Sequence, residues 1–460
     1  MTDGARRLLD QFTAALDAPG PAPDVVLQTG GSLPSVFAVS DLAQASVGAS
    51  GDALARLIGL DGGPVPSVTV DRDLASAWFG FSIRPVGWEL PSPWDAVAGD
   101  YATADGWIKL HTNAPHHRAA ALAVLGVPGD RAAVADAVAA WSSDDLEGAV
   151  VGAGGAAAAL RSIRAWDGHA QGRAVGAEPL VHRDATSDAP ARSAPAGPAA
   201  RPLDGVRVLD LTRILAGPVA TRSLAGWGAE VLRIDPPGWD EPGVDAEVTL
   251  GKRCAVLDLT TPRGRDRFLE LLAGTDVLVH GYRSDALEGL GLGADLRADV
   301  RPGLVDVSLD AYGWSGPWVA RRGFDSLVQM SSGIACAGMD ATGSERPVPL
   351  PVQALDHATG HLLAACALAG LARRRTEGTG SRWRTSLARM ARVLVDAGTV
   401  DGPDGPAIDP APPRPGDPVE RTPWGDAGRL PSPVAVDGAP QRWVLPAGRL
   451  GSSPAEWLPA

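Results

Sequence analysis

The stretch Pro202–Asp235 constrains the fold of this chain more than any other. It contains VRVLDL, a short apolar run typical of a buried strand, then a Gly-Pro turn, a small-residue helical run and a second apolar run, AEVLRID. Strand, loop, helix and strand within about 35 residues have the length of a βαβ unit, whose two strands lie parallel in one sheet. Ligands of such sheets bind beyond the carboxyl ends of the strands, so the loop at 212–218 is the first candidate for a site.

The same alternation of strand and helix patterns continues after this unit. Apolar strand patterns occur in KRCAVLDL, DVLVHGY and GLVDVSLDAYG, with amphipathic helix patterns between them. Two more helices are predicted at Phe324–Ser332 and His357–Arg375. Strands that alternate with helices predict an α/β fold with a doubly wound parallel sheet. We expect this large, Rossmann-like domain to span residues 202–400.

Residues 95–183 predict a smaller α+β domain that precedes the large one. YATADGWIKLHT has the alternation and the Asp-Gly turn of a hairpin, and three short amphipathic helices are predicted in HRAAALAVLGV, RAAVADAVAAW and DDLEGAVVGAGGAAAALRS. Two Ala- and Pro-rich stretches without periodicity, 184–201 and 401–418, are typical of linkers. The second would separate a C-terminal tail, 419–460, from the large domain.

The first 94 residues show an internal similarity to the second half of the chain. VSDLAQASVGASGDALARLIG followed by VTVDRDLASAWF aligns with QALDHATGHLLAACALAGLARR followed by WRTSLARMARVL. In each segment an Asp (Asp41, Asp356) opens a small-residue helix, and a short strand and another helix follow. Two interpretations stay open: Ala-rich helices that are alike by chance, or a partial repeat of the large-domain helices in residues 1–94.

Composition and charge exclude several classes of protein. The net charge of -13 over 460 residues argues against a nucleic-acid partner held through its phosphates. No apolar run reaches the roughly 18 residues that a membrane span needs. The three cysteines (Cys254, Cys336, Cys366) form no CxxC pair, which predicts neither a disulfide framework nor a zinc site. Since the first residues also lack the apolar core of a signal peptide, we expect a reduced, cytoplasmic protein.

Five motifs in the second half occur in a recognisable order. They are VLDLTRILAGPVATRSLAGWGAEVLRID, GKRCAVLDLTTPRGR, DVLVHGYRSDALEGLGLG, VSLDAYGWSGPW and GFDSLVQMSSG. Together they resemble the family III CoA-transferases, the class that includes formyl-CoA transferase, carnitine-CoA transferase and α-methylacyl-CoA racemase. The resemblance covers about Leu203 to Leu394, and residues 95–183 look like the small domain of that family.

The resemblance implies substrates and an assembly. The substrates would be an acyl-CoA thioester and a carboxylic acid, with no permanently bound cofactor. Members of the family form interlocked homodimers, with the active site between the large domain of one subunit and the small domain of the other. In the usual order the small domain follows the α/β domain. Here it precedes it, which implies a permuted or fused arrangement and leaves open whether one chain completes the site.

Asp325, in GFDSLVQ, is the candidate catalytic residue. By its position alone, at the start of an apolar helix, it is an ordinary N-cap. The resemblance implies that it is a nucleophile, which attacks the thioester carbonyl to form an aspartyl–acyl anhydride and release CoA thiolate. The nearby segment 330–333 (MSSG) could offer backbone N–H groups to a developing oxyanion.

The resemblance also assigns contacts with CoA. They fall on Arg213, Ile214, Leu215, Ala216, Lys252, Arg253 and Arg283. The first four would pack on the adenosine and pantetheine. Lys252 and Arg253 would lie near the phosphates, and Arg283 matches an arginine position of the family. The alternative for each basic residue is a solvated surface charge. The sequence departs from the family pattern at Gly281, where an Asn is usual, and at Ser284-Asp285, where Pro-Gly is usual.

Two other functions remain possible from the sequence. A racemase or isomerase needs a second base, usually a His, beside the Asp. No histidine occurs between His280 and His357, where that base is expected, so CoA transfer is favoured. The other possibility is a non-catalytic CoA-binding paralogue. His111, His116 and His117 lack a carboxylate or Cys at ligand spacing, so we expect a solvated loop there and no metal site.

Overall fold

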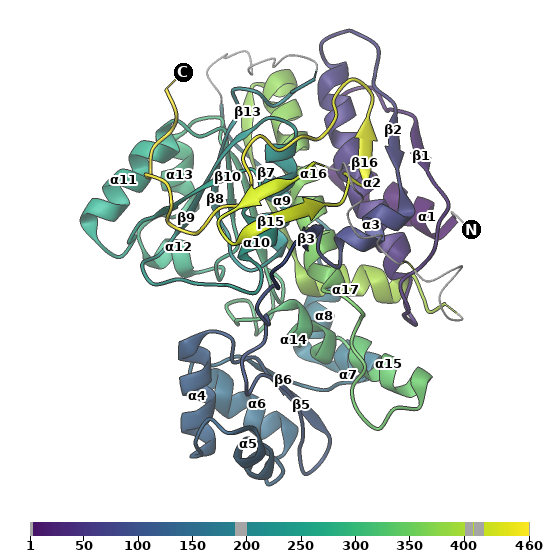
Figure 1. Ribbon diagram of the computed structural model, residues 1–460, viewed down its shortest axis with the longest axis vertical. Coiled ribbons are helices and arrows are strands. Elements are labelled where there is room, and N and C mark those ends of the chain that lie inside the picture. The colour runs from purple at the N-terminus through teal and green to yellow at the C-terminus, as the bar shows by residue number, and fades with distance from the viewer. Residues whose placement is uncertain (1–2, 189–199, 401–407, 409–417, 460) are drawn as a thin grey trace.

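The computed structural model describes residues 3–188, 200–400, 408 and 418–459. Its centre is a seven-stranded sheet with the order β10-β9-β8-β11-β12-β13-β7 (Figure 1). The strands are β7 (His182–Asp188), β8 (Arg207–Leu211), β9 (Glu230–Asp235), β10 (Lys252–Val256), β11 (Val277–His280), β12 (Val305–Asp310) and β13 (Thr379–Ser386). The strands β8 to β13 are parallel to their neighbours, and only β7 is antiparallel. The predicted doubly wound parallel sheet is confirmed.

Alternation along the strands divides the core of the large domain into two layers. Val208 and Val279 face one cluster, which includes α9 (Ala216–Gly226) and α16 (Ala354–Glu377). Leu209 and Leu278 face the other cluster, with α11 (Pro262–Ala273). Because successive side chains of a strand point to opposite faces, apolar runs such as VRVL need helices on both sides of the sheet.

The remaining helices of the large domain are short except for the last two. They are α10 (Asp245–Val248), α12 (Ala286–Gly289), α13 (Ala294–Val300), α14 (Asp325–Ser331), α15 (Ile334–Thr342) and α17 (Leu387–Asp396). None of the helices in the described part of the chain is both long and apolar enough to cross a bilayer.

The small domain is an antiparallel sheet covered by helices. Its strands are β4 (Gly99–Ala102), β5 (Trp107–Leu110) and β6 (Ala157–Ala159), and its helices are α4 (Pro115–Leu125), α5 (Arg131–Val138) and α6 (Ser143–Gly152). The predicted hairpin is confirmed as β4 and β5. The run Ala157–Ala159, expected to be helical, is a strand paired with β5. The helix ends at two glycines, and pairing with β5 outweighs the weak preference of alanine for helix.

The chain returns from the small domain to the large sheet through α7 (Ile163–Gly168), α8 (Ala170–Ala177) and β7. Residues 184–188, expected to begin a linker, are therefore part of an edge strand. The rest of that linker up to residue 199 and most of 401–418 lie outside the described residues. The C-terminal segment forms β14 (Glu420–Thr422), β15 (Gly425–Arg429) and β16 (Val434–Val436), so it packs into the fold instead of trailing from it.

The N-terminal segment completes two small sheets. Its elements are α1 (Asp3–Leu16), β1 (Val25–Leu27), α2 (Val39–Gly59), β2 (Val68–Val70), α3 (Arg72–Trp78) and β3 (Ile83–Pro85). The sheets have the orders β1-β2-β16 and β14-β15-β3, so each combines strands from the two ends of the chain.

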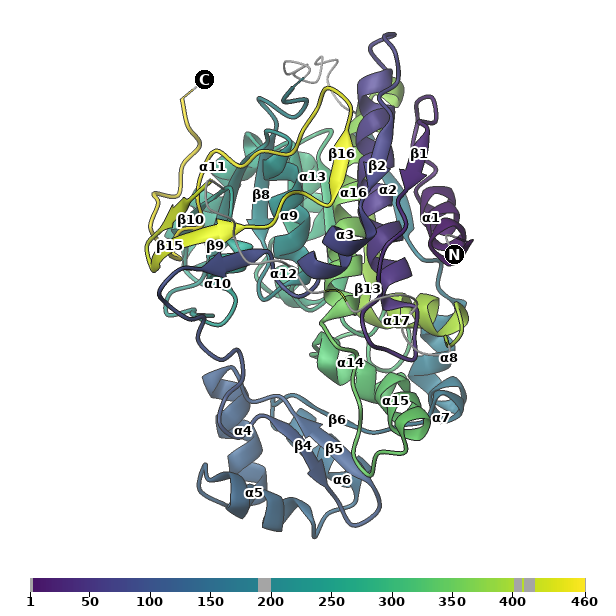
Figure 2. The same cartoon turned by 45° about the vertical axis from the view of Figure 1, so that its right-hand side comes forward.

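The internal similarity corresponds to equal element order. The segment α2–β2–α3 repeats the order of α16–β13–α17, and α2 packs along α16 (Figure 2). The strand of each repeat has an antiparallel neighbour that lies outside its own repeat: β13 pairs with β7, and β2 pairs with β16. A partial repeat in residues 1–94 stays a prediction.

Candidate active site

A crevice is expected where the winding of the sheet reverses. From β8 the chain moves outward through β9 and β10, whereas the adjacent β11 leads to β12 and β13 on the other side. The loops that follow β8 and β11 must therefore part at this point, which is where ligands of such sheets bind. Arg213 follows β8 and donates to the hydroxyl of Tyr282, which follows β11, at 3.2 Å. Its guanidinium carbon lies 4.4 Å from the ring centroid of Trp239 and 4.9 Å from that of Tyr282.

The backbone beside Arg213 is strained. Ile214 has φ of 65°, a left-handed conformation that a β-branched residue rarely adopts. Its N–H donates to the carboxylate of Glu241 at 2.9 Å, which holds the turn. Leu215 and Ala216 follow as buried residues at the start of α9. The four predicted residues 213–216 are thus together at the carboxyl edge of the sheet.

Two of the predicted basic residues lie elsewhere. Lys252 is buried, with its ammonium 3.0 Å from Asp210 and 2.9 Å from the carbonyl oxygen of Pro218. Arg253 contacts Glu230 at 3.4 Å and donates to the carbonyl of Glu456 at 2.6 Å. Because both cations are already paired, neither is presented to a phosphate in this structure. Neither is a solvated surface charge, which was the alternative.

Three arginines, Arg213, Arg283 and Arg322, lie in or near the loops that follow β8 and β11, and we call them the cationic rim. His116 lies beside them. Burial and then the charge of Arg283 lower the pKa of Arg322. Burial and then the charges of Arg322 and Arg213 lower the pKa of His116. The charge of Arg283 thus acts on Arg322, and the charges of Arg322 and Arg213 act on His116. Arg283 is partly exposed, 3.9 Å from Asp285.

Asp325 is the first residue of α14, but it does not cap that helix. The capping position belongs to Phe324, in extended conformation, and no side chain caps the helix there. One carboxylate oxygen of Asp325 accepts from the N–H of Asp356 at 2.9 Å, and the other accepts from the side-chain amide of Gln329 at 2.5 Å. The carboxylate thus lies at the N-terminus of α16, a helix of 24 residues whose dipole favours negative charge there.

Burial makes this carboxylate unusual. Only 2% of Asp325 is exposed, and burial raises its pKa to about 6, although the hydrogen bonds from Asp356 and Gln329 oppose the shift. Burial and then the charge of Asp325 raise the pKa of Asp356 well above its ordinary value. Since Asp325 receives the hydrogen bonds, it ionises first while Asp356 keeps its proton. At neutral pH the site holds one desolvated carboxylate.

The small domain of the same chain closes on α14. Leu327 and Met330 pack with Ala156 and Ala158 in one apolar cluster. Both ribbon views place α14 between the small domain and the large sheet (Figures 1 and 2). Just before this helix, Arg321 pairs with Glu147 of the small domain at 2.9 Å. The sequence left open whether one chain joins the two domains around the aspartate, and in this structure one chain does.

Two small-domain histidines lie against this helix, which the sequence did not predict. The ring of His111 stacks on Phe324 with centroids 3.7 Å apart, and His117 meets the same ring edge-on at 5.8 Å. They are 5% and 4% exposed, so the solvated environment expected for them is wrong. His116 is exposed, but like His117 it lies in α4 and not in a loop. The sequence held no local signal for this burial, because alternation continued from β5 places His111 on the face opposite to the buried Ile108 and Leu110.

The segment 330–333 does not form the expected oxyanion site. Met330 and Ser331 lie in the last turn of α14, and the N–H of Ser332 donates to the carbonyl of Val328 at 2.8 Å. Gly333 then turns the chain with φ of 88°. These N–H groups belong to the far end of the helix from Asp325 and are bonded within it.

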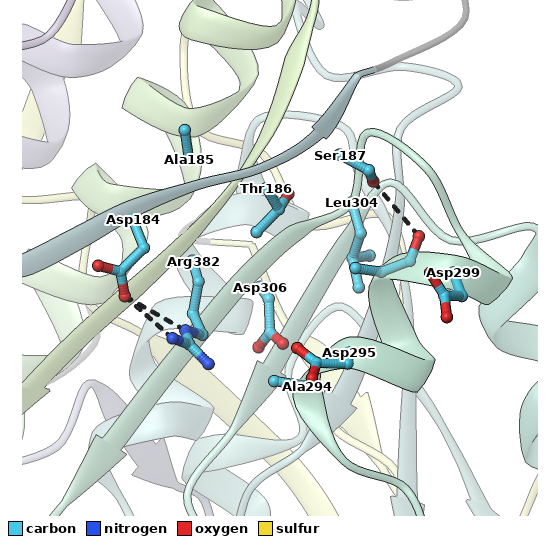
Figure 3. Close-up of a pocket in the computed structure, with 11 residues that line it drawn as sticks. Asp184, Ala185, Thr186, Ser187, Ala294, Asp295, Asp299, Leu304, Asp306 and Arg382 are labelled. Atoms are coloured by element: carbon cyan, nitrogen blue, oxygen red, sulfur yellow. Dashed lines mark hydrogen bonds and ion pairs between the residues drawn. The ribbon is translucent and has the colours of Figure 1, made fainter.

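One described cavity lies apart from this site. It has a volume of about 330 Å³ and lies between β7 and α13, near the amino ends of β12 and β13 (Figure 3). Its lining includes Asp184, Asp295, Asp299 and Asp306, with Arg382 bonded to Asp184 at 3.1 Å. Four carboxylates against one guanidinium disfavour a ligand with phosphate groups. Within the described residues, no group of three or more His, Cys, Asp or Glu could hold a metal ion.

The structure thus combines a doubly wound α/β domain with a buried carboxylate at Asp325. Residues 203–416, a little less than half of the chain, match the family model of CoA-transferase family III.

The chain is also similar to individual CoA-transferases over part of its length. The chain is 34% identical over 232 residues to "Probable fatty acyl-CoA transferase Rv3272" of Mycobacterium tuberculosis, which covers 46% of this chain and 58% of that protein. It is 36% identical over 195 residues to succinyl-CoA:glutarate CoA-transferase of Mus musculus, covering 39% of this chain and 44% of the relative. The chain thus spans about half the length of these relatives. The crystal structure of Rv3272 matches with 33% identity and a TM-score of 0.40, covering 43% of this chain and 57% of that one.

Proposed function

We propose that this protein is a CoA-transferase that moves CoA from an acyl-CoA thioester to a carboxylic acid, with Asp325 as the nucleophile. The observation that carries the proposal is the carboxylate of Asp325, buried in a family III domain and held by the N–H of Asp356 and the amide of Gln329. A desolvated carboxylate is a stronger nucleophile than a hydrated one, because no water shell must be removed before it attacks. Its two hydrogen bonds fix its orientation.

The reaction divides into two exchanges. A carboxylate oxygen of Asp325 attacks the thioester carbonyl, the carbon–sulfur bond breaks, and CoA leaves as a thiolate while an aspartyl–acyl anhydride remains. The acceptor carboxylate then displaces the first acid at the aspartyl carbonyl, which gives a second anhydride. Attack of the CoA thiolate on the acyl carbonyl of this anhydride forms the new thioester and restores the carboxylate of Asp325. Covalent catalysis of this kind replaces one difficult step with easier ones.

We place CoA in the crevice beyond β8 and β11. The cationic rim provides charge for the phosphates, and the rings of Trp239 and Tyr282 that hold Arg213 provide flat surfaces for an aromatic base. The buried residues Leu215 and Ala216 provide an apolar wall for the pantetheine arm. We leave Lys252 and Arg253 out of this site because their cations are paired elsewhere.

The test is to trap the covalent intermediate. Protein incubated with succinyl-CoA and hydroxylamine should carry a hydroxamate on Asp325, detected by peptide mass spectrometry, and should release free CoA. Asp325→Asn should lose the adduct and reduce acyl exchange by at least 1000-fold, on the order expected when a covalent nucleophile is removed. Asp310→Asn is the matched control, since Asp310 is also buried and its pKa is raised to about 8, but it bonds to Gly313 outside the site. An adduct at another residue, or wild-type turnover in Asp325→Asn, would disprove the assignment.

A racemase-type function is the second candidate, because His111 and His117 lie beside Phe324 although no histidine precedes Asp325 closely in sequence. Burial lowers the pKa of His111 to about 3 and that of His117 to about 4. Imidazoles with such low pKa values are poor bases, which favours transfer. In D₂O a racemase would place deuterium on the α-carbon of a branched acyl-CoA without any acceptor acid, and a CoA-transferase would not. A non-catalytic paralogue would bind CoA without forming the adduct.

A further inference from the structure

The small-domain histidines carry nitrogen atoms that lack partners. Nδ1 of His111 and both ring nitrogens of His117 are buried and have no hydrogen-bond partner among the residues that the structure describes. Buried polar groups in native proteins are nearly always paired, since leaving them unpaired loses their hydration without replacement. Both ring nitrogens of the core histidines His357 and His361 also lack partners among the described residues, so unpaired nitrogens alone do not mark a binding site. Those of His111 and His117 differ in their place, because both rings lie against Phe324, the residue before Asp325, where the small domain meets α14.

Packing by itself does not account for these residues. His111 lies flat on Phe324, with an angle of 2° between the rings, and Trp94 meets its other side at 71°. A phenylalanine would make the same stack without burying polar atoms. The imidazole therefore costs stability in the unliganded protein, and such a cost at a site is typical of binding residues.

The charged groups near these histidines favour an anionic ligand. Arg322 lies close enough to His117 for its charge to affect that ring, and it forms no ion pair within the described part of the chain. Lys109 shares the strand β5 with this site, where its ammonium bonds to Asp100 at 2.7 Å. The low pKa values of His111 and His117 keep both rings neutral at neutral pH, so that each offers one N–H. Two neutral donors beside an unpaired guanidinium match the two oxygens of a carboxylate.

We propose that His111 and His117 bind the carboxylate of the acceptor acid beside Asp325, with Arg322 supplying the opposite charge. This rests on the proposed function, since it names which part of the fold selects the second substrate. The large domain binds CoA in the crevice, and the small domain positions the acid. The two substrates then contact different domains, which meet at α14.

Binding can be measured without turnover. Protein labelled with ¹⁵N-histidine is titrated with acetate, oxalate and glutarate, and the imidazole signals are followed by NMR. The signals of His111 and His117 are identified through their contacts with the ring protons of Phe324. At least one acid should shift both signals in a saturable way, while the signals of His357 and His361 in the core stay unchanged. If none of the three acids shifts either signal, the proposal is wrong.

Variants test the same point through kinetics. His111→Phe keeps the stack on Phe324, and His117→Leu keeps an apolar side chain of similar size. With acetyl-CoA, which has no free carboxylate, as donor and glutarate as acceptor, each should raise KM for the acid at least tenfold and change KM for acetyl-CoA less than twofold. His117→Gln retains an N–H donor and should lose less than His117→Leu. His361→Phe is the matched control, because His361 is also buried without a partner in the described residues but lies against Phe79.

The result separates this inference from the proposed function. Acetyl-CoA carries no free carboxylate, so with this donor and no acceptor the hydroxylamine adduct on Asp325 should form at close to the wild-type rate in His111→Phe and His117→Leu. Loss of that adduct in these variants, or a higher KM for acetyl-CoA with an unchanged KM for the acid, would overturn the role assigned to the histidines. Absence of the adduct in the wild type would overturn the CoA-transferase mechanism, while the NMR titration would still decide whether the histidines bind an acid.

Discussion

The backbone N–H of Asp356 donates to the carboxylate of Asp325 at 2.9 Å, so a buried carboxylate lies on the N-terminus of a helix other than its own. The side chain of Asp356 is itself buried beside it. Two carboxyl groups so close together cannot easily both ionise, and the helix N–H decides which of them does. The pH behaviour of the site follows from this pair.

The rate of the first half-reaction should follow the ionisation of Asp325. Because burial raises its pKa to about 6 and only the carboxylate attacks, kcat/KM for the acyl-CoA should fall about tenfold per pH unit below pH 6 and level off above it. The measurement is adduct formation against pH with a saturating concentration of hydroxylamine. Replacing the donor at Gln329 with Leu should move the midpoint to higher pH. If the fall in rate at low pH is unchanged in Gln329→Leu but absent in His111→Phe, the titrating group is the histidine and not Asp325.

Replacing Arg213 should weaken the binding of acyl-CoA, whereas replacing Lys252 should lower the stability of the protein. Arg213→Ala should raise KM for acyl-CoA about tenfold, a magnitude typical of one charged hydrogen bond, and leave stability nearly unchanged. Lys252→Met should instead lower the free energy of unfolding by about 3–5 kcal/mol, because it leaves Asp210 charged and buried without its ammonium partner. Urea unfolding and steady-state kinetics on both variants check this. If Lys252→Met instead raised KM for acyl-CoA without lowering the free energy of unfolding, Lys252 would belong to the CoA site.

The buried carboxylate of Glu247 should hold together segments that are distant in the sequence. It is fully buried, pairs with Arg222 and with Arg429 at 3.0 Å, and accepts from the N–H groups of Ser82 and Ile83 at 3.0 Å each. Glu247→Leu should therefore cost about 3–5 kcal/mol of unfolding free energy, as expected when one partner of a buried ion pair is lost. Denaturant unfolding measures the loss. The control is Glu270→Leu, which removes a surface ion pair with Arg267 and should lower the free energy of unfolding by less than about 1 kcal/mol.

His357 should make the protein sensitive to acid. Burial lowers its pKa to about 3 in the folded state, whereas in the unfolded chain it protonates below about pH 6.5. The unfolded state then binds the extra proton, so this group removes stability as the pH falls from 6.5 towards 3. His357→Phe, which can pack against Phe79, should become more stable relative to the wild type by up to about 1.4 kcal/mol per pH unit in this range. Parallel unfolding curves that keep a constant difference across this range would contradict the assignment.

The sequence predicted the large domain well because its signals are local. Apolar runs such as VRVLDL and DVLVHGY have to be buried strands, and the helices between them fix parallel pairing, so β8, β9 and β11 were predicted within a residue or two. The internal similarity around Asp41 and Asp356 was also visible in residue order. Residue order could not show which strand lies beside the strand of each repeat, namely β16 beside β2 and β7 beside β13.

The site was predicted only in part. Asp325 and the loop at Arg213 were identified through motifs, but the cap expected at Asp325 is absent and Lys252 is paired in the core. His111 and His117 were passed over because a histidine in a loop is exposed in most proteins. Their burial results from the packing of Phe324 on a domain about 200 residues earlier in the chain.

The sequence by itself thus determined the elements, their parallel pairing and the family of the large domain, because periodicity and motif order are properties of neighbouring residues. Only the tertiary structure decided which charges are paired, which imidazoles are buried and which helix N-terminus receives Asp325. Those outcomes depend on desolvation, and desolvation depends on what packs above a side chain from distant parts of the chain.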